Sequence, residues 1–385
     1  MAGIPVARLK RSEPAIKVLH FIPSFGPGGA ERQLALVAPA LARDGVEVHV
    51  AYVTGGPNLA RFDGTDVRLH ALPAASNHDP MLAWRIVRLV RRVHPDVVQT
   101  WLTQMDVLAG GAALLCGVPL IVSERSSAAA YAPGWKTRLR LRIGRRAAGV
   151  VANSRGGIDY WAPHVPADRL HLVRNCVTAD DASATGAIDP DDPLASFVGG
   201  RPLVLFAGRF SYEKNIPALV DALVLVARER PDVAIVMFGD GPERDAAAQR
   251  IAAAGMVDRI ALPGYSPRLQ AWMAGAAACV SVSHFEGHPN VVIEAAFVGC
   301  PLVLSDIPAH RELFDERAVT FVPTDSPSAI ARGVLESLHN PAAARERAAH
   351  AHTIAAQYDL PATVASYRTL YEQVLVRARR TPSPT

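Results

Sequence analysis

Short runs of consecutive apolar residues alternate along the chain with longer stretches whose apolar positions recur every three or four residues. The short runs have the length and β-branched content of buried strands, and the longer stretches have the period of helices. In the first half, a helix is expected from about Ala30, and strands are expected at Lys17–Pro23, Val46–Val53, Val67–Leu72, Asp96–Thr100, Leu120–Ser123, Gly149–Ala152 and His171–Val173. Because strands alternating with helices form parallel sheets covered on both faces, this half predicts a Rossmann-like α/β domain.

The alternation stops at residues 178–200, which are acidic and rich in Pro, Gly, Ser and Asp, and then starts again. Such a segment is typical of a linker. The strands expected beyond it are Pro202–Ala207, Ala234–Phe238, Ile260–Leu262, Ala278–Ser281, Leu302–Leu304 and Val319–Phe321. Helices are expected at 217–229, 243–254, 267–276, 290–299, 326–350 and 360–380. The chain therefore predicts one domain over 1–180, a linker at about 180–200, a second domain over 181–360 and a C-terminal helix over 361–385.

Composition supports a globular protein of two domains and adds a charge asymmetry. Of 385 residues, half are hydrophobic and one fifth are charged. Residues 1–180 contain 22 Arg and Lys against 13 Asp and Glu, a net charge of +9, whereas residues 181–385 contain 18 against 23, or −5. A basic first half indicates a phosphate-rich partner, which can be a nucleic acid, an anionic membrane or a phosphorylated acceptor.

The four cysteines form no C-x-x-C motif and lie among apolar neighbours, which is typical of a reduced cytosolic protein. No secretory signal precedes the first expected strand. The longest uncharged stretch, Val107–Ser123, is interrupted by three glycines and a proline and predicts no membrane span. We therefore expect a cytoplasmic protein.

The segment Glu286–Glu294, EGHPNVVIE, follows an expected strand and enters the expected helix 290–299. Backbone N–H groups at a helix start have no partner within the helix and can bind phosphate or sugar oxygens. Glu286 lies in the loop and Glu294 lies one turn into the helix, where each carboxylate can accept hydrogen bonds from sugar or ribose hydroxyls. A helix with an ordinary capping acid is the alternative that the pattern leaves open.

The segment 208–215, GRFSYEKN, follows another expected strand and places Arg209 and Lys214 five residues apart in a loop. The planar guanidinium fork and the compact ammonium together suit a diphosphate. The chain has 36 Arg but only 4 Lys, and Lys214 is the last of these, so the choice of Lys here indicates a function. Two solvated loop cations are the alternative.

Two glycine-rich turns also lie at strand ends. Gly239 and Asp240 belong to the turn FGDGP, which either faces a base or ribose or is a plain turn. Gly28 and Gly29 belong to GPGGAE, where the backbone can approach a phosphate before the helix begins. Glu31 stands where the G-x-G-x-x-G fingerprint requires its last glycine, which argues against a dinucleotide-dependent dehydrogenase.

Residues 136–146 contain six cations among Leu139, Leu141 and Ile143, directly after Trp135. On a helix these charges spread around much of the circumference. The pattern fits contact with anionic lipid headgroups or a lipid diphosphate, and a solvated basic helix is the alternative.

Two patterns that superficially resemble metal sites do not qualify. His284 and His288 lie four apart, but the intervening Glu is misplaced for H-E-x-x-H, and Gly-His-Pro interrupts a helix. The acidic cluster Asp189-Pro-Asp191-Asp192 contains a D-x-D, but it lies in the expected linker rather than at a strand end, so we interpret the cluster as solvating. The chain also has no G-x-x-x-x-G-K-[ST], which excludes a P-loop NTPase.

Taken in this order, the motifs resemble the retaining glycosyltransferases of family 4, also called glycosyl transferases group 1. That family has the GT-B fold, in which two Rossmann-like domains face each other across a cleft and a C-terminal helix crosses back to the first domain. The segments that carry the resemblance are FGPGGAERQ (25–33), IVSERSS (121–127), ANS (152–154), RN (174–175), FAGRFSYEKN (206–215), FGDGPER (238–244), LPGY (262–265) and EGHPNVVIEA (286–295).

The resemblance implies a nucleotide-sugar donor and roles for matching positions. Arg209 and Lys214 would hold the diphosphate and stabilise the departing nucleotide, Glu286 would take hydroxyls of the transferred sugar, and Arg209, Lys214 and Glu286 are the expected catalytic residues. Glu294 would take the ribose hydroxyls. The donor-binding residues expected are Gly28, Gly29, Arg209, Lys214, Gly239, Asp240, Tyr265, Ser266, Glu286, His288, Pro289, Asn290, Val291 and Glu294. Such enzymes form an α-glycoside with retention and usually need no metal or other cofactor. Uridine is the commoner nucleotide in the family, and guanosine stays open.

The loop Ser123-Glu124-Arg125 departs from the family, because many relatives place a histidine where Arg125 stands here. This form resembles the subgroup that extends lipid-linked oligosaccharides or builds bacterial surface polysaccharides. We therefore expect a polyprenyl-diphosphate-linked glycan as acceptor, contact with the inner face of an anionic membrane, and no nucleic acid. The acceptor-binding residues expected are Trp101, Gln104, Glu124, Arg125, Lys136, Arg138 and Arg142.

Two other functions remain as alternatives. An enzyme on the same fold, such as a nucleotide-sugar epimerase or a sugar-phosphate-forming enzyme, would process the donor without an acceptor alcohol. A non-catalytic subunit of a polysaccharide assembly complex is disfavoured, because Arg209, Lys214, Glu286 and Glu294 are all present.

Overall fold

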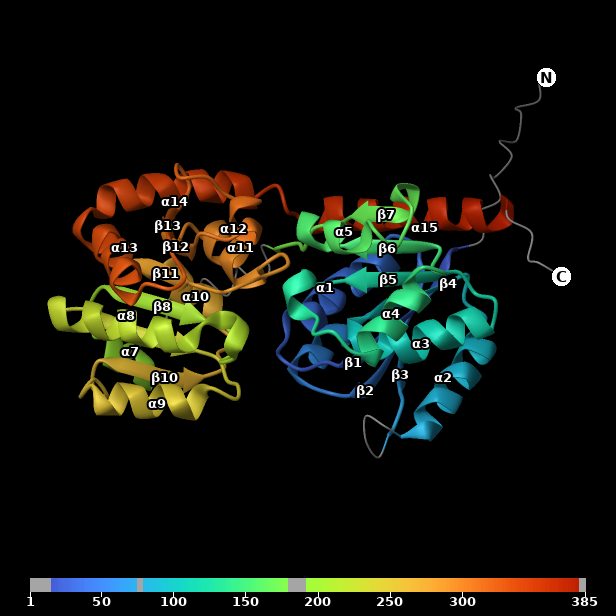
Figure 1. Ribbon diagram of the computed structural model, residues 1–385, viewed down its shortest axis with the longest axis horizontal. Coiled ribbons are helices and arrows are strands. Elements are labelled where there is room, and N and C mark those ends of the chain that lie inside the picture. Colours follow the sequence, from blue (N-terminus) through green and yellow to red (C-terminus); the bar gives the residue numbers. More distant parts are fainter. Residues whose placement is uncertain (1–14, 75–78, 179–191, 381–385) are drawn as a thin grey trace, which may run out of the picture.

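The computed structural model of the chain describes residues 15–74, 79–178 and 192–380. These residues form two α/β units that lie side by side, each built on one parallel sheet with helices on both faces (Figure 1). The fold class expected from the sequence is confirmed.

The described residues of the N-terminal unit form a seven-stranded parallel sheet of order β3-β2-β1-β4-β5-β6-β7. Its strands are β1 (Lys17–Ser24), β2 (Glu47–Thr54), β3 (Arg68–Ala71), β4 (Val97–Trp101), β5 (Leu120–Glu124), β6 (Gly149–Ala152) and β7 (Leu170–Leu172). Its helices are α1 (Gly29–Arg43), α2 (Pro80–Val93), α3 (Leu102–Leu115), α4 (Trp135–Gly144) and α5 (Arg155–Trp161).

Each face of this sheet carries its own apolar core. On one face, α1 contributes Leu34 and Leu41, which pack with side chains of β1 and β2. On the other face, α2, α3 and α4 cover the sheet through residues such as Ile86, Met105 and Ile143. The sheet is thus buried on both sides, as parallel sheets require.

The described residues of the C-terminal unit form a six-stranded parallel sheet of order β10-β9-β8-β11-β12-β13. Its strands are β8 (Leu203–Ala207), β9 (Ala234–Phe238), β10 (Ile260–Gly264), β11 (Ala278–Ser281), β12 (Leu302–Ser305) and β13 (Thr320–Val322). Its helices are α7 (Pro193–Val198), α8 (Ile216–Glu229), α9 (Arg244–Ala253), α10 (Leu269–Ala274), α11 (Asn290–Phe297), α12 (Pro308–Arg311), α13 (Pro327–His339) and α14 (Pro341–Ala355).

The last helix, α15 (Leu360–Arg380), leaves the C-terminal unit and packs against α1 of the N-terminal unit (Figure 1). Tyr367 and Tyr371 are buried in the N-terminal core, and the Tyr371 hydroxyl donates to Gln99 Oε1 at 2.7 Å. The expected return of the C-terminal helix is confirmed, and it anchors the second unit to the first.

Two local expectations differ from the structure. The helix expected over 326–350 is broken at Asn340, because Pro341 has no N–H to continue the first helix and instead begins α14. Within the expected linker, Asp192 does not merely solvate but caps α7 by accepting from the Leu194 N–H at 2.9 Å. Asp189 and Asp191 lie outside the described residues.

Candidate functional site

The two units face each other through the loops that follow their strands. In open parallel sheets, ligands bind beyond the carboxyl ends of the strands, where successive loops diverge. In the C-terminal unit, the loops after β8, β9, β10 and β11 carry the residues that the sequence singled out. These loops are held to one another by backbone hydrogen bonds, so their side chains form one surface.

The loop after β8 is fixed by an unusual backbone conformation and by the loop after β11. Asn215 adopts a left-handed φ of +54°, and its amide donates to the Thr324 carbonyl at 2.7 Å. The His284 N–H donates to the Glu213 carbonyl at 2.9 Å and joins the two loops. Lys214 is thereby directed toward the loop after β11.

Lys214 and Glu286 form an ion pair in that place, and Ser283 Oγ donates to Glu286 Oε1 at 2.7 Å. Burial acts to raise the pKa of Glu286. The charge of Lys214 and the hydrogen bonds from Lys214 and Ser283 outweigh it, so the pKa lies below its ordinary value. Glu286 is therefore an ionised acceptor at neutral pH, and Lys214 is a cation with a fixed position.

Arg209 lies in the same loop with its side chain exposed. Its positive charge acts on Glu31, which lies in the first turn of α1 in the N-terminal unit. Burial raises the pKa of Glu31, while a hydrogen bond from Ser24 and the charge of Arg209 act to lower it. Arg209 is thus an exposed guanidinium that faces the opposite unit.

The turn after β9 is packed backbone to backbone against the loop after β8. Gly239 has a φ of +122°, and a Cβ there would lie 1.9 Å from the Gly208 carbonyl oxygen, so only glycine fits. The Gly239 N–H donates to the Gly264 carbonyl at 2.7 Å, which brings Asp240 beside the end of β10. Tyr265, which follows directly, is exposed and offers a ring for stacking.

Helix α11 begins at the boundary between the units. Pro289 is its N-cap residue, and among the described residues no side chain caps its first turn, so the amides there are available to an anion. The Asn290 amide donates to the Gly29 carbonyl at 3.0 Å. Asn175 donates to the His288 carbonyl at 2.8 Å and to Asn290 Oδ1 at 2.7 Å. The N-terminal glycine loop therefore touches the start of α11.

Glu294, one turn into α11, pairs with Arg32 of α1 at 3.1 Å across the same boundary. Its side chain is 5% exposed, and the charge of Arg32 compensates that of this buried carboxylate. Gln33, the next residue of α1, donates to the Cys176 carbonyl at 2.8 Å. Sequence reasoning missed these contacts, because nothing in the spacing places α1 beside α11.

Two residues expected in an acceptor surface, Trp101 and Glu124, are fully buried, which corrects their predicted direct contact. Trp101 lies beneath Arg125, whose guanidinium carbon is 4.0 Å from the centre of the indole ring. Arg125 also donates to Asn175 Oδ1 at 3.2 Å and to the Tyr367 hydroxyl at 2.5 Å. Arg125 therefore lies at the meeting point of both units and α15.

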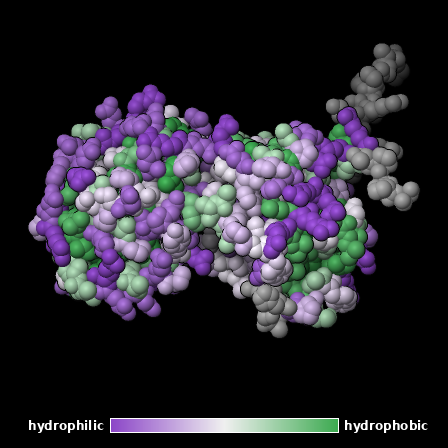
Figure 2. Space-filling view, in the orientation of Figure 1, coloured by the Kyte–Doolittle hydropathy of each residue, from purple (hydrophilic) through white to green (hydrophobic). Residues whose placement is uncertain are grey.

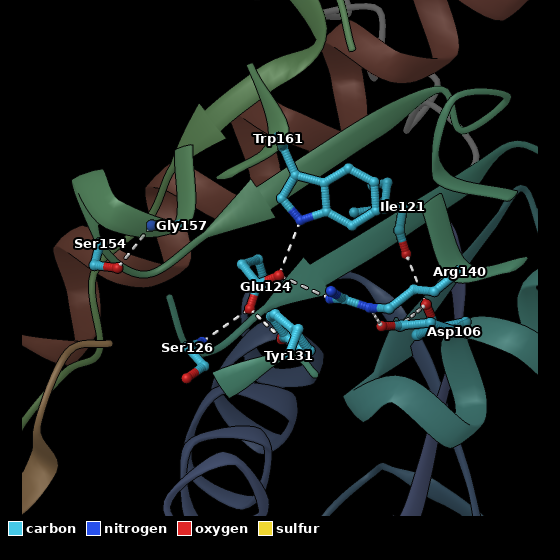
Figure 3. Close-up of polar contacts among 10 residues, drawn as sticks. Asp106, Ile121, Glu124, Ser126, Tyr131, Arg140, Ser154, Gly157 and Trp161 are labelled. Carbon is cyan, nitrogen blue, oxygen red and sulfur yellow. Dashed lines mark hydrogen bonds and ion pairs between the residues drawn. The ribbon is translucent and has the colours of Figure 1, made fainter. Parts of the chain in front are cut away.

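Glu124 belongs to a buried polar network that includes Arg140 (Figure 3). Arg140 donates to Asp106 Oδ2 at 2.7 Å and to Glu124 Oε2 at 2.8 Å, and its guanidinium faces the rings of Tyr131 and Trp161. Glu124 further accepts from the Ser126 N–H, the Tyr131 hydroxyl and Trp161 Nε1, at 2.9, 2.6 and 2.9 Å. The network holds the loop that carries Arg125.

One of the six cations of 136–146, Arg140, is only 1% exposed, so the alternative of a solvated basic helix does not hold for this residue. The other expected acceptor residues on α4, Lys136, Arg138 and Arg142, are exposed on its outer side. Gln104 lies at the start of α3 and is partly buried. The structure thus brings the donor residues together and leaves the basic residues on a separate flank.

His20 and His288 are buried at this boundary, and each has a pKa of about 3. For His20 the causes are burial and then the charge of Arg125, and for His288 they are burial, Arg174 and Arg125. Both imidazoles are therefore neutral at physiological pH.

The unfolded chain binds protons at these histidines below a pH of about 6.5, whereas the folded chain does so only near pH 3. The contribution of the two neutral histidines to the free energy of unfolding is therefore fully present above pH 6.5, and it is lost as the pH drops toward 3. At pH 5 we expect a loss of about 2 kcal/mol for each of His20 and His288 relative to pH 7. Thermal unfolding from pH 7 to 5 measures it. The double variant His20→Gln/His288→Gln should show a flatter dependence, whereas exposed His339→Gln should match the wild type. An unchanged slope in the double variant would contradict the assignment.

Comparison with known proteins supports a common architecture. A family profile described as "Glycosyltransferase Family 4" matches residues 27–181, and one described as "Glycosyl transferases group 1" matches residues 201–340. Among solved structures, Anabaena Alr3699/HepE in complex with UDP-glucose superimposes with a TM-score of 0.80 at 20% identity, over 93% of this chain and all of that one. This likeness shows the two-domain GT-B fold.

Two curated bacterial relatives differ in how much they share. The N-acetylgalactosamine-N,N'-diacetylbacillosaminyl-diphospho-undecaprenol 4-alpha-N-acetylgalactosaminyltransferase of Campylobacter jejuni is 22% identical over 343 residues, which cover 83% of this chain and 89% of that protein. The Vi polysaccharide biosynthesis protein VipC/TviE of Salmonella typhi is 31% identical over 118 residues, which cover 31% of this chain and only 20% of that protein.

Proposed function

The chain belongs to glycosyltransferase family 4, and from that premise we propose which reaction it performs. It transfers a hexose or N-acetylhexosamine from a nucleoside diphosphate sugar, with UDP as the nucleotide, to an acceptor hydroxyl. The anomeric configuration is retained, and the product is an α-glycoside.

One observation carries the donor part of the proposal. Exposed Arg209, the Lys214–Glu286 pair and the uncapped start of α11 lie in adjoining loops at one edge of the C-terminal sheet. Two cations and free amides suit a diphosphate, and an ionised carboxylate beside them suits sugar hydroxyls. In this proposal Glu294 accepts from the ribose hydroxyls, and Gly239, Asp240, Tyr265 and Ser266 border the base.

The chemistry requires stabilisation of a leaving diphosphate. The bond between the anomeric carbon and the phosphate oxygen breaks, and its electron pair leaves with the nucleotide, where Arg209 and Lys214 offset the developing charge. The acceptor oxygen bonds to the anomeric carbon on the same face, and its proton passes to the departing phosphate oxygen. Since side-chain cations supply the positive charge, the proposal assigns no metal to this step.

For the acceptor we propose a glycan linked to a polyprenyl diphosphate, at the inner face of the cell membrane. The Campylobacter relative, whose name includes a diphospho-undecaprenol acceptor, supports this class. The exposed cations Lys136, Arg138 and Arg142 of α4 are suited to bind the acceptor diphosphate. No helix within the described residues is long and apolar enough to cross a membrane.

The test is transfer from a panel of UDP- and GDP-sugars to short polyprenyl-diphosphate glycans, with the new linkage assigned by nuclear magnetic resonance. The proposal predicts an α-linked product from a UDP-sugar. A β-linked product would contradict retention. Conversion of the donor without any acceptor would instead favour an epimerase or a sugar-phosphate-forming enzyme.

The two units approach each other closely at Gly287, in the loop after β11, so we expect a side chain at this position to lower kcat strongly. A Cβ at Gly287 would lie 2.6 Å from the Arg125 carbonyl oxygen and 2.9 Å from Asn153 Oδ1, so Gly287→Ala must push the units apart. A shift of roughly 1 Å at the reacting groups lowers kcat about a hundredfold. Steady-state kinetics measures this, and Gly275→Ala, which meets only contacts at 3.9 Å, is the matched control. Wild-type kcat in Gly287→Ala would show that the close contact of the two units at Gly287 does not matter for catalysis.

A further inference from the structure

Arg32 lies near the start of a helix, where its charge is unfavourable. It is the fourth residue of α1, whose N-cap residue, Gly28, provides no side-chain cap. Because the aligned peptide dipoles make the start of a helix positive, a cation there destabilises the helix. A residue that breaks a local rule of this kind is expected at a functional position, where another contact offsets the unfavourable charge.

The contact that offsets this charge is with Glu294 of the opposite unit. A guanidinium nitrogen of Arg32 lies 3.1 Å from Glu294 Oε2, and the two side chains are 22% and 5% exposed. Burial and then the charge of Glu294 raise the pKa of the Cys279 thiol on β11 to about 12. The thiol is therefore neutral and offers Glu294 no compensating charge, whereas Arg32 does.

Neighbouring contacts fix the start of α1 against α11 and so hold Arg32 in place. Gln33 accepts from the Cys176 N–H at 2.9 Å and donates to Asn290 Oδ1 at 3.3 Å. The Asn290 amide in turn donates to the Gly29 carbonyl at 3.0 Å. Figure 2 shows that the molecule narrows where the two units meet, so the contacts at this boundary decide how α1 sits on α11.

A cation in a fixed position changes what Glu294 can do for a ribose. A carboxylate has about four lone-pair sites, so it can pair with a guanidinium and also accept from hydroxyl groups. A glutamate side chain without a partner moves among rotamers, and ordering it when a ligand binds lowers the affinity. Arg32 orders the carboxylate before a nucleotide arrives.

We propose that Arg32 is a positioning residue for recognition of the donor ribose. It holds the Glu294 carboxylate ionised and oriented, so that the ribose hydroxyls donate to an acceptor that is already in place. The inference rests on the proposed function, in which Glu294 accepts from these hydroxyls. It adds that a residue of the opposite unit, which itself contacts neither the ribose nor the phosphates, sets the strength of this recognition.

Calorimetric titration of the full chain with two nucleotides tests the proposal. UDP carries both ribose hydroxyls, and dideoxyuridine diphosphate lacks both. Hydrogen bonds to a charged acceptor correspond to a difference of about 10- to 100-fold in affinity, by which the wild type should prefer UDP. Arg32→Gln should lower this ratio about three- to tenfold, because Glu294 must then be ordered on binding. The affinity of Arg32→Gln for dideoxyuridine diphosphate should equal that of the wild type.

Three further variants make the result specific. Glu294→Gln should lower the ratio as well, and adding Arg32→Gln to it should cause no further fall, because both changes act through one carboxylate. Arg32→Lys keeps the charge and should retain most of the ratio. The matched control is Glu312→Gln, which breaks another ion pair between the units, with Arg174 at 2.8 Å, and should keep the wild-type ratio.

An equal loss of affinity for both nucleotides in Arg32→Gln would overturn the proposal, because Arg32 would then act on the diphosphate or on the fold. A further fall in the ratio from Glu294→Gln to the double variant would overturn it too, and this comparison applies even if Arg32→Gln alone unfolds. A clear wild-type ratio that Arg32→Gln leaves unchanged would overturn the proposal and leave the proposed function standing. Equal affinity of the wild type for the two nucleotides would overturn both the proposal and the role of Glu294 in the proposed function.

Discussion

Replacement of Arg209 by Ala is expected to lower kcat/KM about 10²- to 10³-fold while the unfolding temperature stays at the wild-type value. The guanidinium is exposed, so its loss disturbs no packing, and any effect on rate reports on the leaving diphosphate. One preorganised charged donor at a developing anion is worth about 2–4 kcal/mol of barrier. Steady-state kinetics with the identified donor, alongside thermal unfolding, measures both quantities.

Lys214→Ala should lower kcat/KM by a similar factor, but it also removes the ion-pair partner of Glu286. For that reason Arg209→Ala is the cleaner variant, and Arg228→Ala, an exposed arginine on α8, is the control that should keep full activity. Near-wild-type turnover in both Arg209→Ala and Lys214→Ala would rule out the donor site described here.

Replacement of Arg140 by Met is expected to cause the largest loss of stability. The guanidinium is the shared partner of the Asp106 and Glu124 carboxylates, and its removal leaves two buried carboxylates without a cation. Breaking a buried ion pair by removing one partner costs about 3–5 kcal/mol, which corresponds to a fall of roughly 10 °C in unfolding temperature. Circular dichroism on heating measures this fall.

The same helix offers a matched control. Arg138 lies two residues earlier and is exposed, so Arg138→Met should leave the unfolding temperature nearly unchanged. Adding Asp106→Asn and Glu124→Gln to Arg140→Met removes the uncompensated charges and should recover more than half of the loss. If Arg140→Met unfolded at the same temperature as the wild type, the network around Arg140 would not stabilise the fold.

The strands were predictable from the sequence because a strand buried on both faces of a parallel sheet is a short continuous apolar run. The interval Gly149–Ala152 agrees with β6 at both ends, and Lys17–Pro23 falls one residue short of β1. Helix boundaries were less predictable where one continuous apolar pattern spans two successive helices. Pro341 marks the end of one helix and the start of the next, but the apolar period runs through it.

The site was predictable only as far as it lies in loops at strand ends. Arg209, Lys214 and Glu286 were found because charged residues directly follow apolar runs, but the pairing of Lys214 with Glu286 depends on how two loops pack. The burial of Arg140 had a detectable signal. Arg140, Ile143, Gly144 and Ala147 have the spacing of one helix face, and the last three are apolar, so the arginine lies on the inner face. No such signal existed for Arg32 and Glu294, which lie in different units.

The central claim is that the adjoining loops of the C-terminal unit bind a nucleoside diphosphate, and titration with UDP, GDP and ADP followed by thermal unfolding tests it most directly. A ligand at 100 times its Kd stabilises the folded protein by about 2.7 kcal/mol, which raises the unfolding temperature by several degrees. The account predicts such a rise with UDP alone, its loss in Arg209→Ala and its persistence in Arg228→Ala. An equal rise in the wild type and in Arg209→Ala, or no rise with any of the three nucleotides, would contradict it.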